Sequence, residues 1–184
     1  MSQHSPASAR DPRPSTRDPL TVLGVDPGLR VTGWGIVAAT RDELRALASG
    51  VIAPDDSRPT EERLHDIFLG LCDVIGRWRP AEVAVEDPFV GQNARSAFAI
   101  GEARAVALLA AAQAGLPVRS YAPTEVKLAV TGYGRSDKAQ VQELVRVQLD
   151  LATAPEPVDA SDALAVALCH HLRHRMEARL ETAR

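Results

Sequence analysis

The sequence is poor in cysteine. Cys72 and Cys169 are the only two in 184 residues. Two cysteines are too few for a disulfide framework, and their separation does not fit a zinc site. Both lie in apolar segments with helical periodicity, where a buried free thiol is common. We therefore expect two buried and chemically inert cysteines.

Long apolar runs are also missing. No stretch of the chain reaches the roughly 18 apolar residues that a membrane helix needs. The first 20 residues lack the apolar stretch of a secretory signal. We expect a cytoplasmic protein that has no membrane partner.

A large net charge is the third absence. The formal net charge is −3 and the pI is about 6.0, which argues against a protein that coats nucleic acid without selectivity. Between Val90 and Gln148, however, basic residues outnumber acidic ones. The acidic residues of this stretch are Glu102, Glu125, Asp137 and Glu143. The basic residues of this stretch are Arg95, Arg104, Arg119, Lys127, Arg135, Lys138 and Arg146. The middle of the chain is therefore net basic.

Lysine is scarce as well. Among 21 lysine and arginine residues only Lys127 and Lys138 are lysines. An ammonium group is a compact charge with an adjustable pKa, which suits a site near reacting phosphates. Chance and codon bias are the alternative explanation.

The residues that are present predict one folded domain. Residues 1–19 are rich in proline, serine and arginine without periodicity, so we expect a disordered tail. Residues 20–178 have the length and composition of a single globular domain. Residues 179–184 are expected to fray.

Short apolar segments and amphipathic segments alternate along this domain. Segments 21–26, 31–39 and 44–53 predict an antiparallel meander of strands, and buried strands are predicted at 81–87 and 116–121. Helical periodicity occurs at 59–78, 96–115, 123–131, 137–149 and 158–179, with Thr60 as a candidate N-cap. The fold class is therefore α/β. We expect a mixed five-stranded sheet in which the first, fourth and fifth strands are parallel, with helices on both faces.

Four acidic residues lie at predicted strand ends or at the start of the last helix. Asp26 ends the first strand and Glu86 ends the fourth, which is expected beside it. Asp159 and Asp162 lie on one face of the last helix. Functional groups gather at the carboxyl ends of parallel strands, so we expect these four carboxylates to meet.

Each acid also has a purely structural explanation. Asp26 begins an Asp-Pro-Gly turn, and Glu86 could be a solvated strand end. Asp159 could cap the last helix, and Asp162 could compensate its dipole. Four carboxylates in one place, however, repel one another unless a cation or raised pKa values relieve them. Such oxygen ligands select Mg²⁺ or Mn²⁺, and two ions would support phosphodiester hydrolysis, so the cluster predicts a two-metal nuclease.

Five ordered segments resemble the RuvC family of Holliday junction resolvases. They are DPGLRVTGWG (26–35), VEDPFVGQN (85–93), GEARAVA (101–107), YAPTEVKLAVTGYGRSDKAQV (121–141) and DASDALAVALCH (159–170). The similarity spans about residues 21–175. It implies a ribonuclease H-like fold and a homodimer that nicks two symmetric strands of four-way junction DNA in recombination and repair. It also implies a partnership with the RuvA and RuvB branch-migration complex.

The resemblance assigns roles to individual residues. The family's catalytic, metal-binding acids correspond to Asp26, Glu86, Asp159 and Asp162, which would bind two Mg²⁺ or Mn²⁺ ions per active site. Its DNA-facing lysines correspond to Lys127 and Lys138. The alanine-rich helix 94–114 is a candidate dimer interface.

Candidate DNA contacts surround these positions. Phe89 resembles the family's base-stacking aromatic residue, and a buried core residue is the alternative. Gly132 and Gly134 permit close backbone approach and Ser136 is a candidate helix cap, whereas a plain flexible loop is the alternative there. The full set of candidate contacts is Phe89, Asn93, Arg95, Arg104, Lys127, Arg135 and Lys138.

The histidines of the last helix are expected to be structural or surface residues, and the two tryptophans are expected to be core residues. His170, His171 and His174 lie two to three helical turns beyond Asp162, too far along the helix to share its ligands. Trp34 and Trp78 lie in periodic apolar patterns that place them in the core.

The sequence therefore predicts a metal-dependent, structure-selective endonuclease, and the resemblance implies that its cuts leave 5′-phosphate and 3′-hydroxyl ends. A catalytically silent junction-binding scaffold is one alternative, and it would lack one or more of the four acids. An actin-like ATP-binding phosphotransferase is another, because its first strand also ends in Asp-x-Gly. That fold needs two such domains, and this chain has room for one.

Overall fold

The computed structural model describes residues 19–40, 43–88 and 94–182. Within them the chain forms a five-stranded sheet of order β3-β2-β1-β4-β5. The strands are β1 (Leu20–Asp26), β2 (Thr32–Ala39), β3 (Leu44–Ile52), β4 (Glu82–Glu86) and β5 (Val118–Tyr121). The helices are α1 (Thr60–Trp78), α2 (Ala94–Gln113), α3 (Pro123–Thr131), α4 (Lys138–Gln148) and α5 (Val158–Thr182).

The strand directions confirm the predicted mixed sheet. β1 pairs antiparallel with β2, and β2 pairs antiparallel with β3. β1 pairs parallel with β4, and β4 pairs parallel with β5. The meander therefore forms one half of the sheet, and the fourth and fifth strands form the other.

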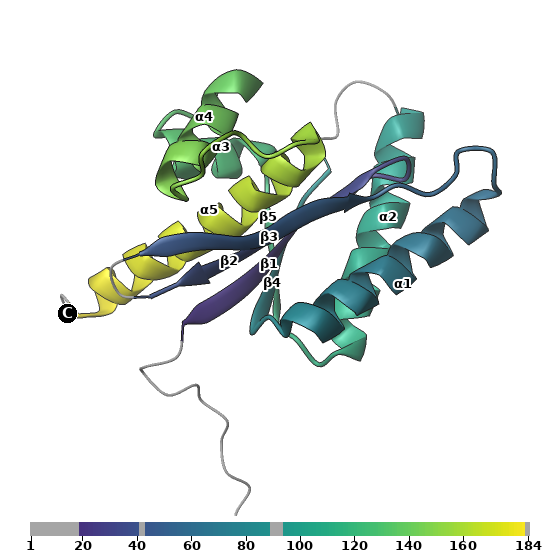
Figure 1. The fold of residues 1–184 in the computed structure, drawn as a ribbon, viewed down its shortest axis with the longest axis horizontal. Coiled ribbons are helices and arrows are strands. Elements are labelled where there is room, and N and C mark those ends of the chain that lie inside the picture. Colours follow the sequence, from purple (N-terminus) through teal and green to yellow (C-terminus); the bar gives the residue numbers. More distant parts are fainter. Residues whose placement is uncertain (1–18, 41–42, 89–93, 183–184) are drawn as a thin grey trace, which may run out of the picture.

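Helices cover both faces of the sheet (Figure 1): α1 and α2 lie on one side, and α3, α4 and α5 lie on the other. Alternating side chains of β1 supply the two cores, because successive residues of a strand point to opposite faces. Val22 packs into the core under α3, α4 and α5, whereas Leu23 and Val25 pack into the core under α1 and α2. Trp34 and Trp78 pack against the second core, as predicted.

Some local predictions were wrong or only partly right. α1 begins at Thr60, with Pro59 in the cap position and no side-chain capping bond, so Thr60 is not the N-cap. Cys169 is buried as expected, but Cys72 is only partly buried because it lies on the flank of α1. Burial raises the pKa of both thiols, which keeps them protonated and unreactive. Among the described helices none is both long and apolar enough to cross a membrane.

Candidate active site

The site begins where two parallel strands end side by side. The register of β1 and β4 places Val25 beside Val85, so the next residues, Asp26 and Glu86, leave the same edge of the sheet together. Their carboxyl groups share a hydrogen bond. A carboxyl pair can make such a bond only when one of the two is protonated.

Burial and mutual repulsion perturb both acids. Burial raises the pKa of Asp26 to about 6, and the negative charge of Asp162 adds to this increase. Burial raises the pKa of Glu86 to about 8, helped by the charge of Asp26. Two carboxylates this close cannot both ionise easily at neutral pH, because their negative charges repel each other. A bound cation would offset this repulsion, so the pair indicates a candidate functional site.

Helix α5 brings the remaining acids to this edge because it lies almost directly on the sheet. A Cβ atom on Gly24 would lie 2.1 Å from the carbonyl oxygen of Ala163, and one on Gly33 would lie 2.0 Å from that of Asp159. Glycine in β1 and β2 is therefore what permits the close approach of the helix.

The two acids of α5 lie in different surroundings. Burial raises the pKa of Asp162, whose carboxylate forms a 2.7 Å ion pair with Nζ of Lys138. The charge of Asp159 raises the pKa of both Asp26 and Asp162, so it acts on the same cluster. Asp159 also lines a second, neighbouring pocket.

Both lysines of the chain face the acids. A pocket of about 250 Å³ is lined by Glu86, Pro123, Val126, Lys127, Lys138, Val141, Asp162 and Ala165. Burial lowers the pKa of Lys138, but the bond to Asp162 outweighs it and the net shift is upward. Lys138 therefore remains charged beside the carboxylates, and its counterpart Lys127 lowers the pKa of Asp162 from the same pocket.

The donor set fits divalent metal ions. In the described part of the chain no three acidic, histidine or cysteine side chains are arranged as a finished metal cage. Instead Asp26 bonds to Glu86, and Asp162 bonds to Lys138. Half-buried oxygen donors with raised pKa values are ligands that Mg²⁺ and Mn²⁺ would select, and a bound cation would favour their charged forms.

The loop between α3 and α4 is tightly organised. The hydroxyl groups of Thr131 and Ser136 lie 2.7 Å apart, and that of Ser136 donates to the carbonyl oxygen of Tyr133. The prediction that Ser136 caps α4 was wrong: it is buried in this network, and Asp137 accepts the capping bond from the backbone N–H of Gln140. This loop holds Lys138 at the first residue of α4 and exposes Arg135.

The other candidate DNA contacts divide into two groups. Phe89 and Asn93 lie outside the described residues, as does the side chain of Arg95. The side chain of Arg104 forms a 2.8 Å ion pair with Asp87 and a 2.7 Å hydrogen bond to Ser120. Arg104 therefore ties α2 to the ends of two strands beside Glu86, and its contact with DNA stays a prediction.

The histidines have structural partners. Nδ1 of His170 lies 2.9 Å from the hydroxyl group of Tyr121, and its Nε2 lies 3.0 Å from the carboxylate of Glu82. Nε2 of His171 lies 3.0 Å from the carbonyl oxygen of Val37. Both rings are buried, which agrees with the structural role that their distance from Asp162 predicted.

A group of charged residues next to the site was missed in the sequence. Arg30, Asp56 and Arg63 line the pocket that also contains Asp159. They come from the β1–β2 turn, the β3–α1 connection and α1, and no spacing rule joins these segments. The one available signal was the position of Arg30, four residues after Asp26 in the same turn.

The chain is similar to known crossover junction endodeoxyribonucleases. The family model for the crossover junction endodeoxyribonuclease RuvC matches residues 22–170. A RuvC of Dehalococcoides mccartyi is 49% identical over 152 residues, covering 83% of this chain and 92% of that protein. A RuvC of Chloroflexus aurantiacus is 50% identical over 151 residues, covering 82% and 92%. The structure of Thermus thermophilus RuvC in complex with a Holliday junction substrate superposes with a TM-score of 0.81 at 38% identity, covering 86% of this chain and 96% of that one.

Proposed function

The chain belongs to the RuvC family of crossover junction endodeoxyribonucleases, and on that premise we propose that Asp26, Glu86, Asp159 and Asp162 are its catalytic acids. The protein is an endonuclease that resolves Holliday junctions in recombination and repair. The observation that carries the proposal is the half-buried Asp26–Glu86 pair, whose raised pKa values and shared hydrogen bond require compensation.

Divalent metal use follows from membership of this nuclease family, and the donor set favours two Mg²⁺ or Mn²⁺ ions per site. Bound between these acids, such ions would lower the pKa of a water molecule and stabilise the oxygen that leaves the scissile phosphate. β1 and β4 end side by side, and Asp159 lies close to Gly33, which pairs with Asp26. These neighbours support the entry of the phosphate at this edge of the sheet.

The lysines act on the phosphate. A water oxygen attacks the phosphorus, the bond from phosphorus to the 3′-oxygen breaks, and the 3′-oxygen takes up a proton. This leaves a 5′-phosphate and a 3′-hydroxyl. Negative charge grows on the phosphoryl oxygens as this happens, and the ammonium of Lys138, already aligned by Asp162, offsets that charge. Lys127 lines the same pocket and would contact the same strand.

Paired nicking requires two active sites, and a homodimer supplies them. The surface of α2 supports this arrangement. Phe98, Ala105, Leu109 and Ala112 are exposed on that helix. Their spacings of seven, four and three residues place them along one stripe, as in a helix-packing face. Cooperation with the RuvA and RuvB complex, and a cytoplasmic site of action on chromosomal DNA, complete the proposal.

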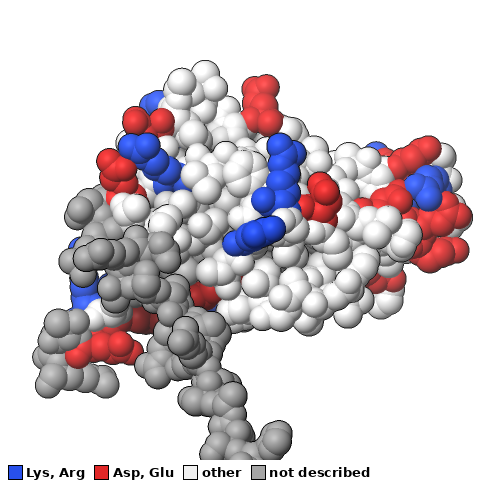
Figure 2. Space-filling model, turned by 60° about the horizontal axis from the view of Figure 1, so that its bottom comes forward, with Lys and Arg blue, Asp and Glu red and all other residues white. Residues whose placement is uncertain are grey.

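The charge on one face of the molecule is mixed in sign, which agrees with a selective DNA-binding protein. On the face shown in Figure 2, acidic side chains gather at one end, over the β3–α1 connection and the start of α1. Basic side chains form small separate groups on the same face. Such a face would not attract a DNA backbone along its whole length.

Mapping the cuts on a mobile four-way junction tests the proposal. Each strand is labelled in turn, and the protein is added with Mg²⁺ or with Mn²⁺. We expect nicks at symmetric positions in two opposing strands, with ends that DNA ligase seals. Binding without nicks under both metals would favour the silent scaffold and would overturn the proposal.

A further inference from the structure

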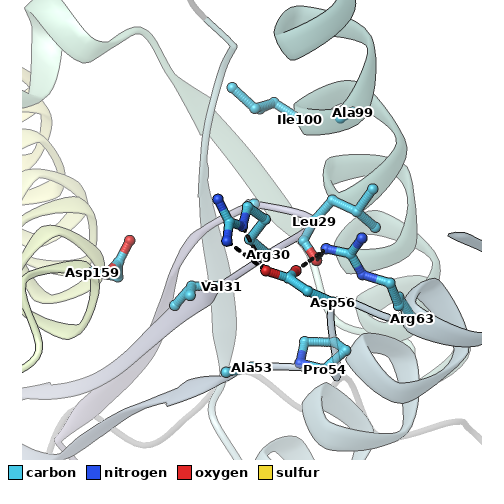
Figure 3. A pocket seen from close by; sticks show the side chains of 11 residues that line it. Leu29, Arg30, Val31, Ala53, Pro54, Asp56, Arg63, Ala99, Ile100 and Asp159 are labelled. Carbon is cyan, nitrogen blue, oxygen red and sulfur yellow. Dashed lines mark hydrogen bonds and ion pairs between the residues drawn. The ribbon is translucent and has the colours of Figure 1, made fainter. Parts of the chain in front are cut away.

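A second pocket opens beside the acid cluster. Its volume is about 740 Å³, within the range of sites that bind small ligands. Figure 3 shows its construction: Arg30, Asp56 and Arg63 are joined in a row, Asp159 faces them from α5, and Ala99 and Ile100 of α2 lie on a third side. The pocket therefore shares one wall, Asp159, with the proposed catalytic site.

The three charged residues form a fixed unit. Nε and Nη2 of Arg30 contact the same carboxylate oxygen of Asp56 at 2.8 and 2.6 Å. The other oxygen of Asp56 accepts a 2.8 Å hydrogen bond from Arg63, which also donates to the carbonyl oxygen of Leu29 at 3.0 Å. One carboxylate thus orients two guanidinium groups, and the unit keeps one positive charge in excess.

The backbone that carries Arg30 is also held rigidly. The hydroxyl group of buried Thr32 donates to the carbonyl oxygen of Gly28 at 2.8 Å and accepts from its N–H at 3.3 Å. The side chain of Arg30 itself is 82% exposed. Within the described residues, Nη1 of Arg30 has no recorded partner, so one end of the guanidinium fork is open to a ligand.

The rest of the pocket wall is apolar. Val31, Ala53, Pro54, Ala99 and Ile100 supply it. Among the described lining residues, only the three members of the charged unit and Asp159 carry polar side chains. Such a wall suits a sugar ring and offers little with which to distinguish the edges of the bases.

We propose that this pocket binds the DNA backbone of the cleaved strand at a nucleotide next to the scissile phosphate, with Arg30 on the phosphate and Asp56 as the positioning residue. The inference rests on the proposed function, because it places the scissile phosphate at Asp159 and its neighbours. Arg30 then fixes the register of the strand, independently of its base sequence.

The first test uses the full chain carrying Asp26→Asn. Its binding to a synthetic four-way junction is measured over a series of salt concentrations. In that background we compare Arg30→Gln, Arg30→Lys and Arg58→Gln. Arg58 is a matched control, because it is an exposed arginine paired with Glu62 and Asp66 and does not line the pocket. We expect Arg30→Gln to weaken binding about five- to tenfold and to reduce the slope of log Kd against log salt by about 0.9. The other two should keep the slope.

The second test locates the contacted phosphate. Methylphosphonate, which is uncharged, replaces one phosphate of the cleaved strand at a time. Replacement at one position flanking the cut should weaken the binding of the parent Asp26→Asn chain but should not weaken Arg30→Gln further, as expected for two partners of one contact. Equal further losses at every position, or Arg30→Gln behaving like Arg58→Gln, would overturn the proposal.

Asp56→Asn tests the positioning role. It leaves both arginines charged, so the salt slope should persist while the selectivity for one methylphosphonate position is lost. Asp55→Asn is the control, because Asp55 bonds to Ser57 and does not line the pocket. Retention of the selectivity by Asp56→Asn would contradict the role given to Asp56.

Two other outcomes are distinguishable. If the unaltered chain does not cut the junction, the proposed function fails. If it cuts the junction but Arg30→Gln instead lowers dimer formation in the absence of DNA, the pocket binds a second copy of the chain and only the present inference is wrong.

Discussion

At the scale of single residues, we propose that Lys138 connects the acids to the DNA. Its ammonium group is 2.7 Å from the carboxylate of Asp162 and its side chain is 63% exposed, so it can also contact a phosphate. Lys138→Met should slow single-turnover cleavage about 10²-fold while weakening junction binding only a few-fold, because the charge matters most when negative charge develops on the phosphate.

Arg135→Met is the control for that substitution, because Arg135 is exposed on the same loop. It should weaken binding with little effect on the rate at saturating protein. Equal losses of binding and of rate in Lys138→Met would show that Lys138 only binds the DNA backbone and does not assist the reaction.

Burial of His171 predicts a pH dependence of stability. Burial lowers the pKa of His171 from 6.5 to about 4 in the folded protein. Above pH 6.5 the ring is neutral in both states. Between pH 6.5 and 4 the unfolded chain binds a proton that the folded chain does not, so the free energy of unfolding falls by up to about 1.4 kcal/mol per pH unit.

His171→Gln removes the titrating ring, and its amide can still donate to the carbonyl oxygen of Val37. Urea unfolding at pH 7.5 and at pH 5.5 should show a smaller difference in this variant than in the unaltered chain. His65→Gln, at an exposed position of α1, should leave the difference unchanged. A difference that His171→Gln does not reduce would contradict the assignment.

At the scale of elements, the contact between α5 and the sheet places the acids. A Cβ on Gly33 would lie 2.0 Å from the carbonyl oxygen of Asp159, so Gly33→Ala must push the start of α5 away from β2. We expect a loss of about 1–3 kcal/mol in the free energy of unfolding, typical of overpacking. A displacement of about 1 Å would also lower the cleavage rate about 10²-fold.

Gly76→Ala provides the matched comparison. Gly76 lies in α1 with nothing within 4 Å of its added Cβ, so alanine should raise the free energy of unfolding by about 0.5–1 kcal/mol without changing cleavage. Similar cleavage rates in Gly33→Ala and the unaltered chain would show that the position of α5 is not critical.

The order and direction of the elements could be predicted because each depends on a periodic pattern or a connection rule. Helix starts were less certain: Thr60 and Ser136 are each one residue away from the true cap, and hydroxyl-bearing residues near a helix start do not reveal which of two neighbours takes that position. Asp26 and Glu86 could be paired in advance because parallel strands end together.

The Arg30–Asp56 contact joins residues 26 positions apart through exposed connections. Connections of this kind carry no periodicity, so only the folded chain brings these two residues together. The same holds for the placement of Asp159 on the wall of the second pocket, which depends on how closely α5 approaches β2.

At the scale of the whole molecule, the exposed stripe of α2 predicts the assembly. Leu109 is 59% exposed there, and burying it against a partner would remove apolar surface from water. Sedimentation at micromolar concentration should show a dimer for the unaltered chain. Leu109→Glu should shift it toward monomer, because an unpaired carboxylate would be buried at the contact.

Leu180→Glu is the control, because Leu180 is equally exposed but lies near the end of α5. It should remain dimeric. If the Leu109→Glu variant remains dimeric, the dimer interface lies on a surface other than this stripe of α2.

The most direct test of the account is the single-turnover cleavage of a four-way junction by Asp26→Asn in Mg²⁺ and in Mn²⁺, with junction binding measured alongside. Asparagine keeps the size of the side chain and can still bond to Glu86, but it removes a charged oxygen donor. The account predicts that cleavage falls at least about 10³-fold while binding persists, and that Asp73→Asn, at an exposed position of α1, changes neither. Unchanged cleavage by Asp26→Asn would contradict the account.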